Sequence, residues 1–183
     1  MEENSTIISG FGGQGVILAG KTLARSGMEK GLEVTWLPSY GAEMRGGTAN
    51  CTVILSSDLI SSPIVDNPDT LIAFNEPSLD KFGPKVQEEG QIIFNSSLEE
   101  SPAKRNGIDT LGIGLNEIAS ELGNKKVINM VALGAWARTT GKLSLEELRE
   151  GMTLTLEKAG KAEFVDINRK ALRSGYEGSN LGK

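Results

Sequence analysis

A strand, a glycine-rich turn and a helix follow one another at the start of the chain, and this succession limits the folds open to it. Residues 6–9 form a short apolar run, and from residue 15 to residue 30 apolar and small side chains recur at helical spacing. The glycines between them have the GxGxxG spacing, which is typical of a tight turn whose backbone amides face an anion at a helix start. The sequence therefore predicts a Rossmann-like glycine turn after the first strand, with binding roles for Gly10, Gly12, Gly13, Gln14 and Gly15.

The rest of the chain continues this alternation, which predicts an α/β fold with a mostly parallel sheet. Further strands are expected at residues 33–37, 48–55, 70–74, 91–95 and 107–113, and further helices at residues 79–82, 116–122, 127–139, 144–158 and from 163 onward. The second and third strands are too close in sequence for a crossover helix, so we expect them to be antiparallel and the sheet to be mixed. Asn116 is the expected cap of its helix, and Ser144 and Glu147 have the spacing of a capping box. We predict one three-layer α/β/α domain over residues 1–183, with a frayed tail at residues 175–183.

Two absences exclude several kinds of chemistry. The chain has no histidine, which is the commonest general base and zinc ligand, and Cys51 is its one cysteine. We therefore expect no internal disulfide, no metal site and no histidine-dependent catalytic residue in this chain, and any iron–sulfur cluster must be held elsewhere. Cys51 lies in an apolar run, which favours a small buried side chain over a nucleophile.

Charge and hydropathy narrow the partners and the compartment. The net charge is −5 and the basic residues are scattered, which disfavours nucleic acid and an anionic membrane as partners. No run approaches the roughly 18 apolar residues of a membrane span, and acidic residues stand where a signal peptide has basic ones. We expect a cytoplasmic protein.

A second glycine-rich turn, at residues 37–48, joins the second and third expected strands. Arg45 could bind a carboxylate or phosphate through two parallel hydrogen bonds, Tyr40 could stack on a ligand, and Glu43 could orient Arg45. In an ordinary solvated loop the two charges would form only a weak surface ion pair. The concentration of glycines and functional groups favours a binding loop instead. The candidate residues are Ser39, Tyr40, Gly41, Glu43, Arg45, Gly46 and Gly47.

The first turn lacks one part of an ordinary NAD site. Such a site needs a carboxylate at the end of the second strand, where it holds the ribose hydroxyls. That end is Trp36-Leu37-Pro38-Ser39, and Glu33 stands at the beginning of the strand. Two interpretations remain open on the residues alone: a stand-alone nucleotide-binding protein or NAD(P)-dependent dehydrogenase, and a structural module whose glycines only allow tight packing.

Three motifs, in order and spacing, resemble the gamma subunit of the 2-oxoacid:ferredoxin oxidoreductases, the pyruvate/ketoisovalerate oxidoreductase family. They are GFGGQGVILAG at residues 10–20, SYGAEMRGG at residues 39–47 and NMVALGA at residues 129–135. The chain has Ala42 where family members often have proline. The form of the second motif resembles the 2-oxoglutarate and 2-oxoisovalerate members more than the pyruvate ones.

The resemblance implies a multi-subunit enzyme that decarboxylates a 2-oxoacid oxidatively, transfers the acyl group to coenzyme A and reduces ferredoxin. Thiamine diphosphate, magnesium and the iron–sulfur clusters would belong to partner subunits, namely the alpha, beta and ferredoxin-like delta chains. This chain would be inactive alone and would contribute to the coenzyme A side and to subunit contacts. The phosphates of coenzyme A would suit the amides of residues Gly12 to Gly15 and the charge of Arg45.

Two other positions are weaker candidates. Asn129 is singled out by the third motif, and we favour a backbone hydrogen bond at a helix end over a ligand contact for it. Asn75 and Glu76 end the fourth strand, where ligands bind in open α/β sheets. Loops at that edge can also have a purely structural role.

Overall fold

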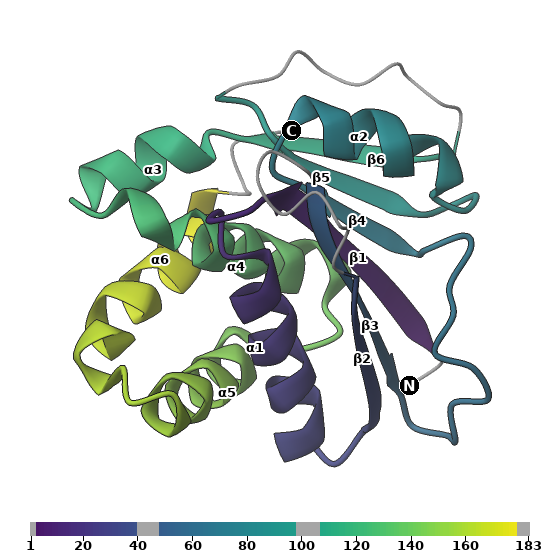
Figure 1. The fold of residues 1–183 in the computed structure, drawn as a ribbon, viewed down its shortest axis with the longest axis horizontal. Helices are drawn as coiled ribbons and strands as arrows, with labels where there is room; N and C mark the ends of the chain where they lie inside the picture. The colour runs from purple at the N-terminus through teal and green to yellow at the C-terminus, as the bar shows by residue number, and fades with distance from the viewer. Residues whose placement is uncertain (1–2, 40–47, 98–106, 179–183) are drawn as a thin grey trace.

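A six-stranded sheet lies at the centre of the molecule, with its strands in the order β2-β3-β1-β4-β5-β6 (Figure 1). The computed structural model describes residues 3–39, 48–97 and 107–178. The strands are β1 (Asn4–Phe11), β2 (Glu33–Ser39), β3 (Thr48–Ser56), β4 (Thr70–Ala73), β5 (Gln91–Asn95) and β6 (Asp109–Ile113). The α-helices are α1 (Val16–Glu29), α2 (Glu76–Phe82), α3 (Leu115–Glu121), α4 (Ile128–Thr140), α5 (Leu145–Lys158) and α6 (Val165–Gly178), with short 3₁₀ turns η1 (Gly83–Lys85), η2 (Lys125–Val127) and η3 (Ala162–Phe164).

The strand β3 makes the sheet mixed, because it runs antiparallel to both of its neighbours. The strands β1, β4, β5 and β6 are parallel to one another. The prediction of a mostly parallel, mixed sheet is therefore confirmed. In a dinucleotide-binding fold of the Rossmann order, the second strand lies beside the first. Here β3 lies between β1 and β2, so the strand order differs from that fold.

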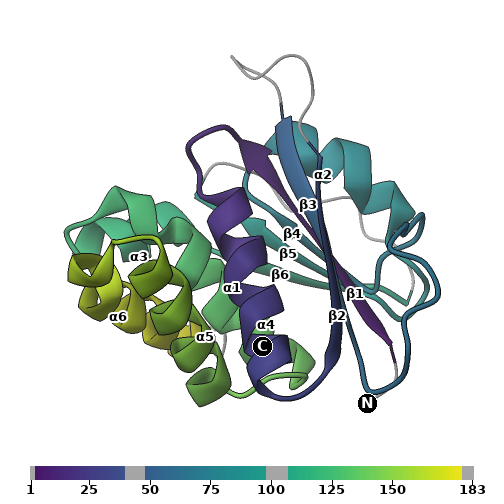
Figure 2. The same cartoon turned by 60° about the horizontal axis from the view of Figure 1, so that its bottom comes forward.

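The two faces of the sheet are covered unequally (Figures 1 and 2). The helices α1, α3, α4, α5 and α6 lie on one face, over the larger hydrophobic cluster. The other face carries α2 and η1 over a smaller cluster that includes Ile7, Leu71 and Phe94. The three-layer architecture is confirmed, with one thick and one thin helical layer. No helix of the described residues is long and apolar enough to cross a membrane.

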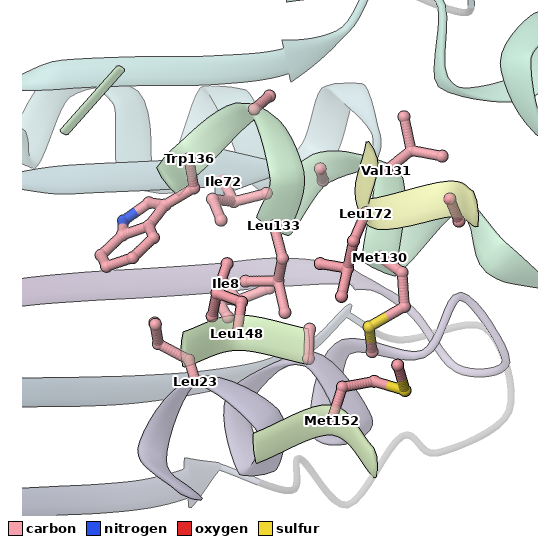
Figure 3. Packing of buried hydrophobic residues seen from close by; sticks show 14 of the residues in the cluster. Ile8, Leu23, Ile72, Met130, Val131, Leu133, Trp136, Leu148, Met152 and Leu172 are labelled. Atoms are coloured by element: carbon pink, nitrogen blue, oxygen red, sulfur yellow. The ribbon is translucent and has the colours of Figure 1, made fainter. Parts of the chain in front are cut away.

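The helix α4 is the most buried of the helices described, and every residue from Ile128 to Ala137 is buried. Figure 3 shows Trp136 and Leu133 of α4 among sheet residues such as Ile8 and Ile72. On its other side α4 packs closely against α6, because both helices carry glycine where their backbones meet. The prediction of a buried helix with small residues for close packing is confirmed.

Two helix starts test the predicted caps. In α5, Ser144 and Glu147 form the predicted capping box, with the Ser144 hydroxyl accepting from the Glu147 N–H and the Glu147 carboxylate from the Ser144 N–H. In α3 the predicted cap is wrong, because Gly114 is the N-cap and Asn116 lies in the first turn. The acceptors come instead from outside the helix. Asn95 Oδ1 accepts from Leu115 N–H at 3.2 Å, and Ser97 Oγ accepts from Asn116 N–H at 3.0 Å.

Candidate functional site

The glycine turn joins the carboxyl end of β1 to the start of α1, as the sequence predicts. Gly13 and Gly15 have φ angles of 95° and 80°, a left-handed conformation that glycine adopts without strain. The turn is closed by a hydrogen bond of 3.2 Å from Gln14 N–H to the Phe11 carbonyl. Gly12 and Gly13 are exposed, and no atom of a described residue lies within 4 Å of a Cβ placed on Gly13. The tip of the turn is therefore open to a ligand.

The first turn of α1 presents amides that no side chain caps. Gly15 is the N-cap and supplies no side-chain hydrogen bond, and the first turn holds no acidic residue. The first helical hydrogen bond runs from Ala19 N–H to the Gly15 carbonyl at 2.9 Å, so the amides of residues 16–18 have no acceptor within the helix. The positive end of the helix dipole lies at the same place. This geometry can bind an anionic group such as a phosphate.

Gln14 and Gly10 connect the glycine turn to the residues that follow β4. Gln14 Oε1 accepts from Phe11 N–H at 2.6 Å and from Asn75 Nδ2 at 3.4 Å, and Gln14 Nε2 donates to the Phe74 carbonyl at 3.4 Å. A Cβ on Gly10 would lie 2.6 Å from Gln14 Oε1 and 2.9 Å from Phe74 Cβ. These contacts anchor the turn to the end of β4, and direct binding by either residue stays a prediction.

Asn129 connects the start of α4 to the same turn. Its side chain is buried, and Nδ2 donates to the Gly15 carbonyl at 3.1 Å. A Cβ on Gly15 would lie 2.5 Å from Asn129 Nδ2, so the pair requires glycine there. The favoured interpretation of Asn129, a backbone hydrogen bond at a helix end, is confirmed.

Sequence reasoning missed other buried polar residues at this edge of the sheet. Ser9 at the end of β1 donates to the hydroxyl of Ser78 in α2 at 2.9 Å. Asn75, which the sequence did single out, caps α2 by accepting from Ser78 N–H at 3.0 Å. Asn95 is the last residue of β5 and is fully buried. Its Oδ1 accepts from the N–H of Leu115, the first residue of α3, as described above. The partners of Ser9 and Asn95 lie 69 and 20 positions away, so no local pattern predicts these two bonds.

The second predicted turn begins at the same edge. Ser39 is exposed and ends β2, and β3 separates it from β1 through the row Ser39, Asn50 and Ser9. Two strand spacings, roughly 10 Å, thus lie between the ends of β2 and β1. The remaining predicted residues fall outside the described part of the chain, and a site shared by the two turns stays a prediction. They are Tyr40, Gly41, Glu43, Arg45, Gly46 and Gly47.

Cys51 is a buried core residue, as expected. Its side chain is inaccessible, and burial raises the pKa of the thiol to about 12. A thiol that stays protonated is neither a nucleophile nor a metal ligand at neutral pH. Among the residues described, no group of three or more Cys, Asp or Glu side chains is placed to hold a metal ion.

Comparisons with known proteins show the family of the chain. A model of the family described as pyruvate ferredoxin/flavodoxin oxidoreductase matches residues 5–178. The ketoisovalerate oxidoreductase subunit VorA of Methanothermobacter marburgensis is 40% identical over 172 residues, which are 93% of this chain and 35% of that relative. The chain thus spans about a third of the length of VorA.

Two solved structures have the same fold. The gamma subunit of a keto/oxoacid ferredoxin oxidoreductase from Geobacter sulfurreducens PCA is 30% identical, with a TM-score of 0.81 over 97% of this chain and 99% of that one. The 2-oxoglutarate:ferredoxin oxidoreductase from Magnetococcus marinus, described with 2-oxoglutarate, coenzyme A and succinyl-CoA bound, is 25% identical, with a TM-score of 0.87 over 99% of this chain and 32% of that one. From its motifs, its fold and these matches, the chain belongs to the pyruvate ferredoxin/flavodoxin oxidoreductase family.

Proposed function

We propose that this chain is the gamma subunit of a 2-oxoacid:ferredoxin oxidoreductase and that its glycine turn binds the phosphates of coenzyme A. The assembled enzyme decarboxylates a 2-oxoacid oxidatively, forms the acyl-CoA and passes electrons to ferredoxin. The proposal of a separate gamma subunit is supported by the match over nearly the whole of the Geobacter sulfurreducens gamma chain.

The observation that carries the coenzyme A part is the uncapped start of α1 beside an exposed glycine turn. Coenzyme A has a pyrophosphate and a ribose phosphate, and both are anions of the kind that free helix amides bind. The residues of the turn are compatible with such a group, because no acidic side chain lies in the first turn of α1 and no described residue fills the space beyond Gly13. The Magnetococcus marinus relative is described with coenzyme A bound, which supports the same ligand class here.

The chemistry of decarboxylation is assigned to other subunits. Thiamine diphosphate supplies the stabilised carbanion in such reactions, and iron–sulfur clusters carry single electrons. This chain has no histidine, and its one cysteine is a buried thiol with a raised pKa. We therefore assign thiamine diphosphate, magnesium and the clusters to alpha, beta and delta partners, while this chain contributes to coenzyme A binding and to subunit contacts.

A pair of glycine substitutions in the assembled enzyme tests the coenzyme A assignment. Gly13 and Gly123 both have positive φ angles, and at neither would an added Cβ lie within 4 Å of an atom in the described part of the chain, so alanine imposes the same kind of backbone strain at each. We expect Gly13→Ala to raise the KM for coenzyme A by about fivefold to tenfold, or about 1 kcal/mol, with the KM for the 2-oxoacid unchanged. Gly123→Ala, at the end of α3, is the control and should leave both constants unchanged. Equal KM values for coenzyme A in the two variants would show that the turn does not bind it.

Purification from the source cell tests the subunit assignment separately. We expect this chain to co-purify with larger partners, and the complex to show the broad visible absorption of iron–sulfur clusters. A colourless monomer that binds a nucleotide tightly would favour the stand-alone alternative. Because this measurement does not involve Gly13, the two parts of the proposal can fail independently.

A further inference from the structure

A buried side chain of α4 holds the peptide group at which α1 begins. Asn129, the second residue of α4, is 1% exposed, and its Nδ2 donates to the Gly15 carbonyl at 3.1 Å. Ala19 N–H donates to the same carbonyl oxygen at 2.9 Å, so both lone pairs of this oxygen are used. The start of α1 is therefore tied to a second helix, 114 positions away in the chain, as well as to its own backbone.

The orientation of the Asn129 amide is fixed by its oxygen. Oδ1 accepts from the N–H of Met130, in the first turn of α4, at 3.0 Å. If the amide were turned over, its oxygen would face the Gly15 carbonyl oxygen and its NH₂ group would face the Met130 N–H. One orientation therefore satisfies both contacts, and it directs Nδ2 at Gly15. The helix that carries the amide is buried from Ile128 to Ala137, which gives the amide a rigid base.

The carbonyl that Asn129 holds belongs to the peptide group between Gly15 and Val16. In a planar trans peptide the C=O and N–H bonds point in opposite directions. The Gly15 carbonyl points into α1 and towards Asn129, so the Val16 N–H points out of the start of the helix, where it has no acceptor within the helix. A carbonyl that accepts two hydrogen bonds is polarised, which strengthens the N–H of the same peptide group as a donor.

The close contact at Gly15 also restricts rotation of this peptide group. A Cβ on Gly15 would lie 2.5 Å from Asn129 Nδ2 and 2.8 Å from Asn129 Cγ, so the amide occupies the space that a side chain would need. Gly15 has a φ angle of 80°, which glycine adopts without strain. An anion that binds at the turn therefore meets a donor that is already oriented.

We propose that Asn129 is a positioning residue for coenzyme A, which holds the Val16 N–H in the direction of a phosphate oxygen without touching the ligand itself. This inference rests on the coenzyme A site proposed at the glycine turn. Without the contact, the peptide group between Gly15 and Val16 gains freedom, and the ligand must order it on binding. The loss falls on the affinity for coenzyme A, because the decarboxylation chemistry is assigned to other subunits.

Two substitutions of Asn129 in the assembled enzyme test the proposal through steady-state kinetics. Asn129→Ala removes the donor without adding charge, and we expect it to raise the KM for coenzyme A by about threefold to tenfold, as for one lost hydrogen bond. Asn129→Asp keeps the shape of the side chain and an acceptor for Met130 N–H, and it should raise this KM further, because a carboxylate then faces the Gly15 carbonyl. The KM for the 2-oxoacid, and kcat at saturating coenzyme A, should stay within about twofold of wild type.

Asn168 of α6 provides the matched control. It is 6% exposed, and its Nδ2 donates to a backbone carbonyl, that of Phe164, at 2.7 Å. Asn168→Ala and Asn168→Asp thus make the same chemical changes at a buried amide whose bond does not involve the glycine turn. They should lower the melting temperature, as the Asn129 variants should, and leave the KM for coenzyme A unchanged. A role for Asn129 in stability alone would give this result at both positions.

The outcomes separate this inference from the proposed function. An unchanged KM for coenzyme A in folded Asn129→Ala, together with a raised one in Gly13→Ala, would overturn the role of Asn129 and leave the site at the turn in place. A raised KM in Asn129→Asp alone would also overturn it, since repulsion by the added charge would then be the cause. Unchanged values in Gly13→Ala and in both Asn129 variants would overturn the coenzyme A site and this inference with it.

Discussion

At the residue scale, Cys51 shows how burial changes the role of a side chain. The thiol lies between α1 and the sheet, where Sγ donates to the Val16 carbonyl at 3.6 Å. A Cβ on Gly20 would lie 2.4 Å from this sulfur and 2.7 Å from Trp36 Nε1, so α1 approaches the sheet closely at this point. Cys51 is therefore part of the packing that supports the helix below the glycine turn.

The raised pKa of Cys51 predicts a pH-dependent contribution to stability. The unfolded thiol titrates near 9.0 and the folded thiol near 12, so the unfolded state loses its proton first as the pH rises. Below pH 9.0 the free energy of unfolding contains the full contribution of Cys51. This contribution is lost progressively between pH 9.0 and about 12, and the free energy of unfolding falls by at most about 1.4 kcal/mol per pH unit.

Urea denaturation of the wild type and of Cys51→Ala between pH 7 and pH 10.5 measures this effect. The wild type should be more stable at neutral pH, because alanine leaves a cavity of about one sulfur atom. The difference in the free energy of unfolding between the two proteins should become smaller above pH 9.0, where the thiol of the unfolded wild type ionises. Parallel stability curves for the two proteins would contradict the prediction.

At the element scale, the contact between α4 and α6 depends on two glycines. A Cβ on Gly134 would lie 2.0 Å from the Leu172 carbonyl oxygen, and a Cβ on Gly175 would lie 1.8 Å from the Val131 carbonyl oxygen. In both cases the obstacle is backbone, which cannot rotate away as a side chain can. The start of α4 holds Asn129 and hence the glycine turn, so this packing also positions the candidate site.

We predict that Gly175→Ala destabilises the chain by about 3 kcal/mol, because the two helices must move apart. Gly178→Ala is the control on the same helix, since the nearest atom to its Cβ would be Ile118 Cδ1 at 3.7 Å. That variant should be neutral or more stable by up to about 1 kcal/mol, because alanine favours the helix. Urea or thermal denaturation compares them, and similar stabilities for both variants would refute the backbone contact.

At the scale of the whole molecule, the thin helical layer leaves apolar side chains exposed. Leu37 of β2 is 45% exposed, and it shares a cross-strand row with Thr52 and with Ile7 of the smaller cluster. Leu59 and Ile64, in the connection between β3 and β4, are 87% and 71% exposed. Exposed apolar groups are typical of contact surfaces, and the proposed gamma subunit needs such a surface for its partners.

A Leu59→Ser/Ile64→Ser double variant tests whether this connection contacts a partner. Both side chains are exposed, so the free energy of unfolding of the chain should stay within about 0.5 kcal/mol of the wild-type value. Co-expression followed by affinity purification should recover less of the partner subunits. Met28→Ser removes an exposed apolar side chain from α1 and is the control. Undiminished assembly of the double variant would exclude this connection from the interface.

The sequence alone determined the order of elements and placed most of their ends within about two residues of the observed ends. The run at residues 91–95 matches β5 exactly in extent, and the capping box of Ser144 and Glu147 starts α5. Periodicity and capping are local properties, and for that reason they can be predicted without the fold. The predicted cap of α3 was wrong because the capping contacts of this helix are not local. The acceptors for its first N–H groups are Asn95 and Ser97, which lie about twenty residues earlier in the chain.

The family and the positions of the glycines were also accessible from the sequence, because the motifs at residues 10–20 and 129–135 are continuous stretches. Only the tertiary structure showed that Asn129 bonds to Gly15, that Gln14 anchors the turn to β4, and that β3 lies between β1 and β2. A polar hollow at the opposite edge of the sheet is likewise lined by the starts of four separate strands, β1, β4, β5 and β6. These features depend on contacts between distant segments, and such contacts are decided by packing and strand pairing over the whole molecule, which no local pattern contains.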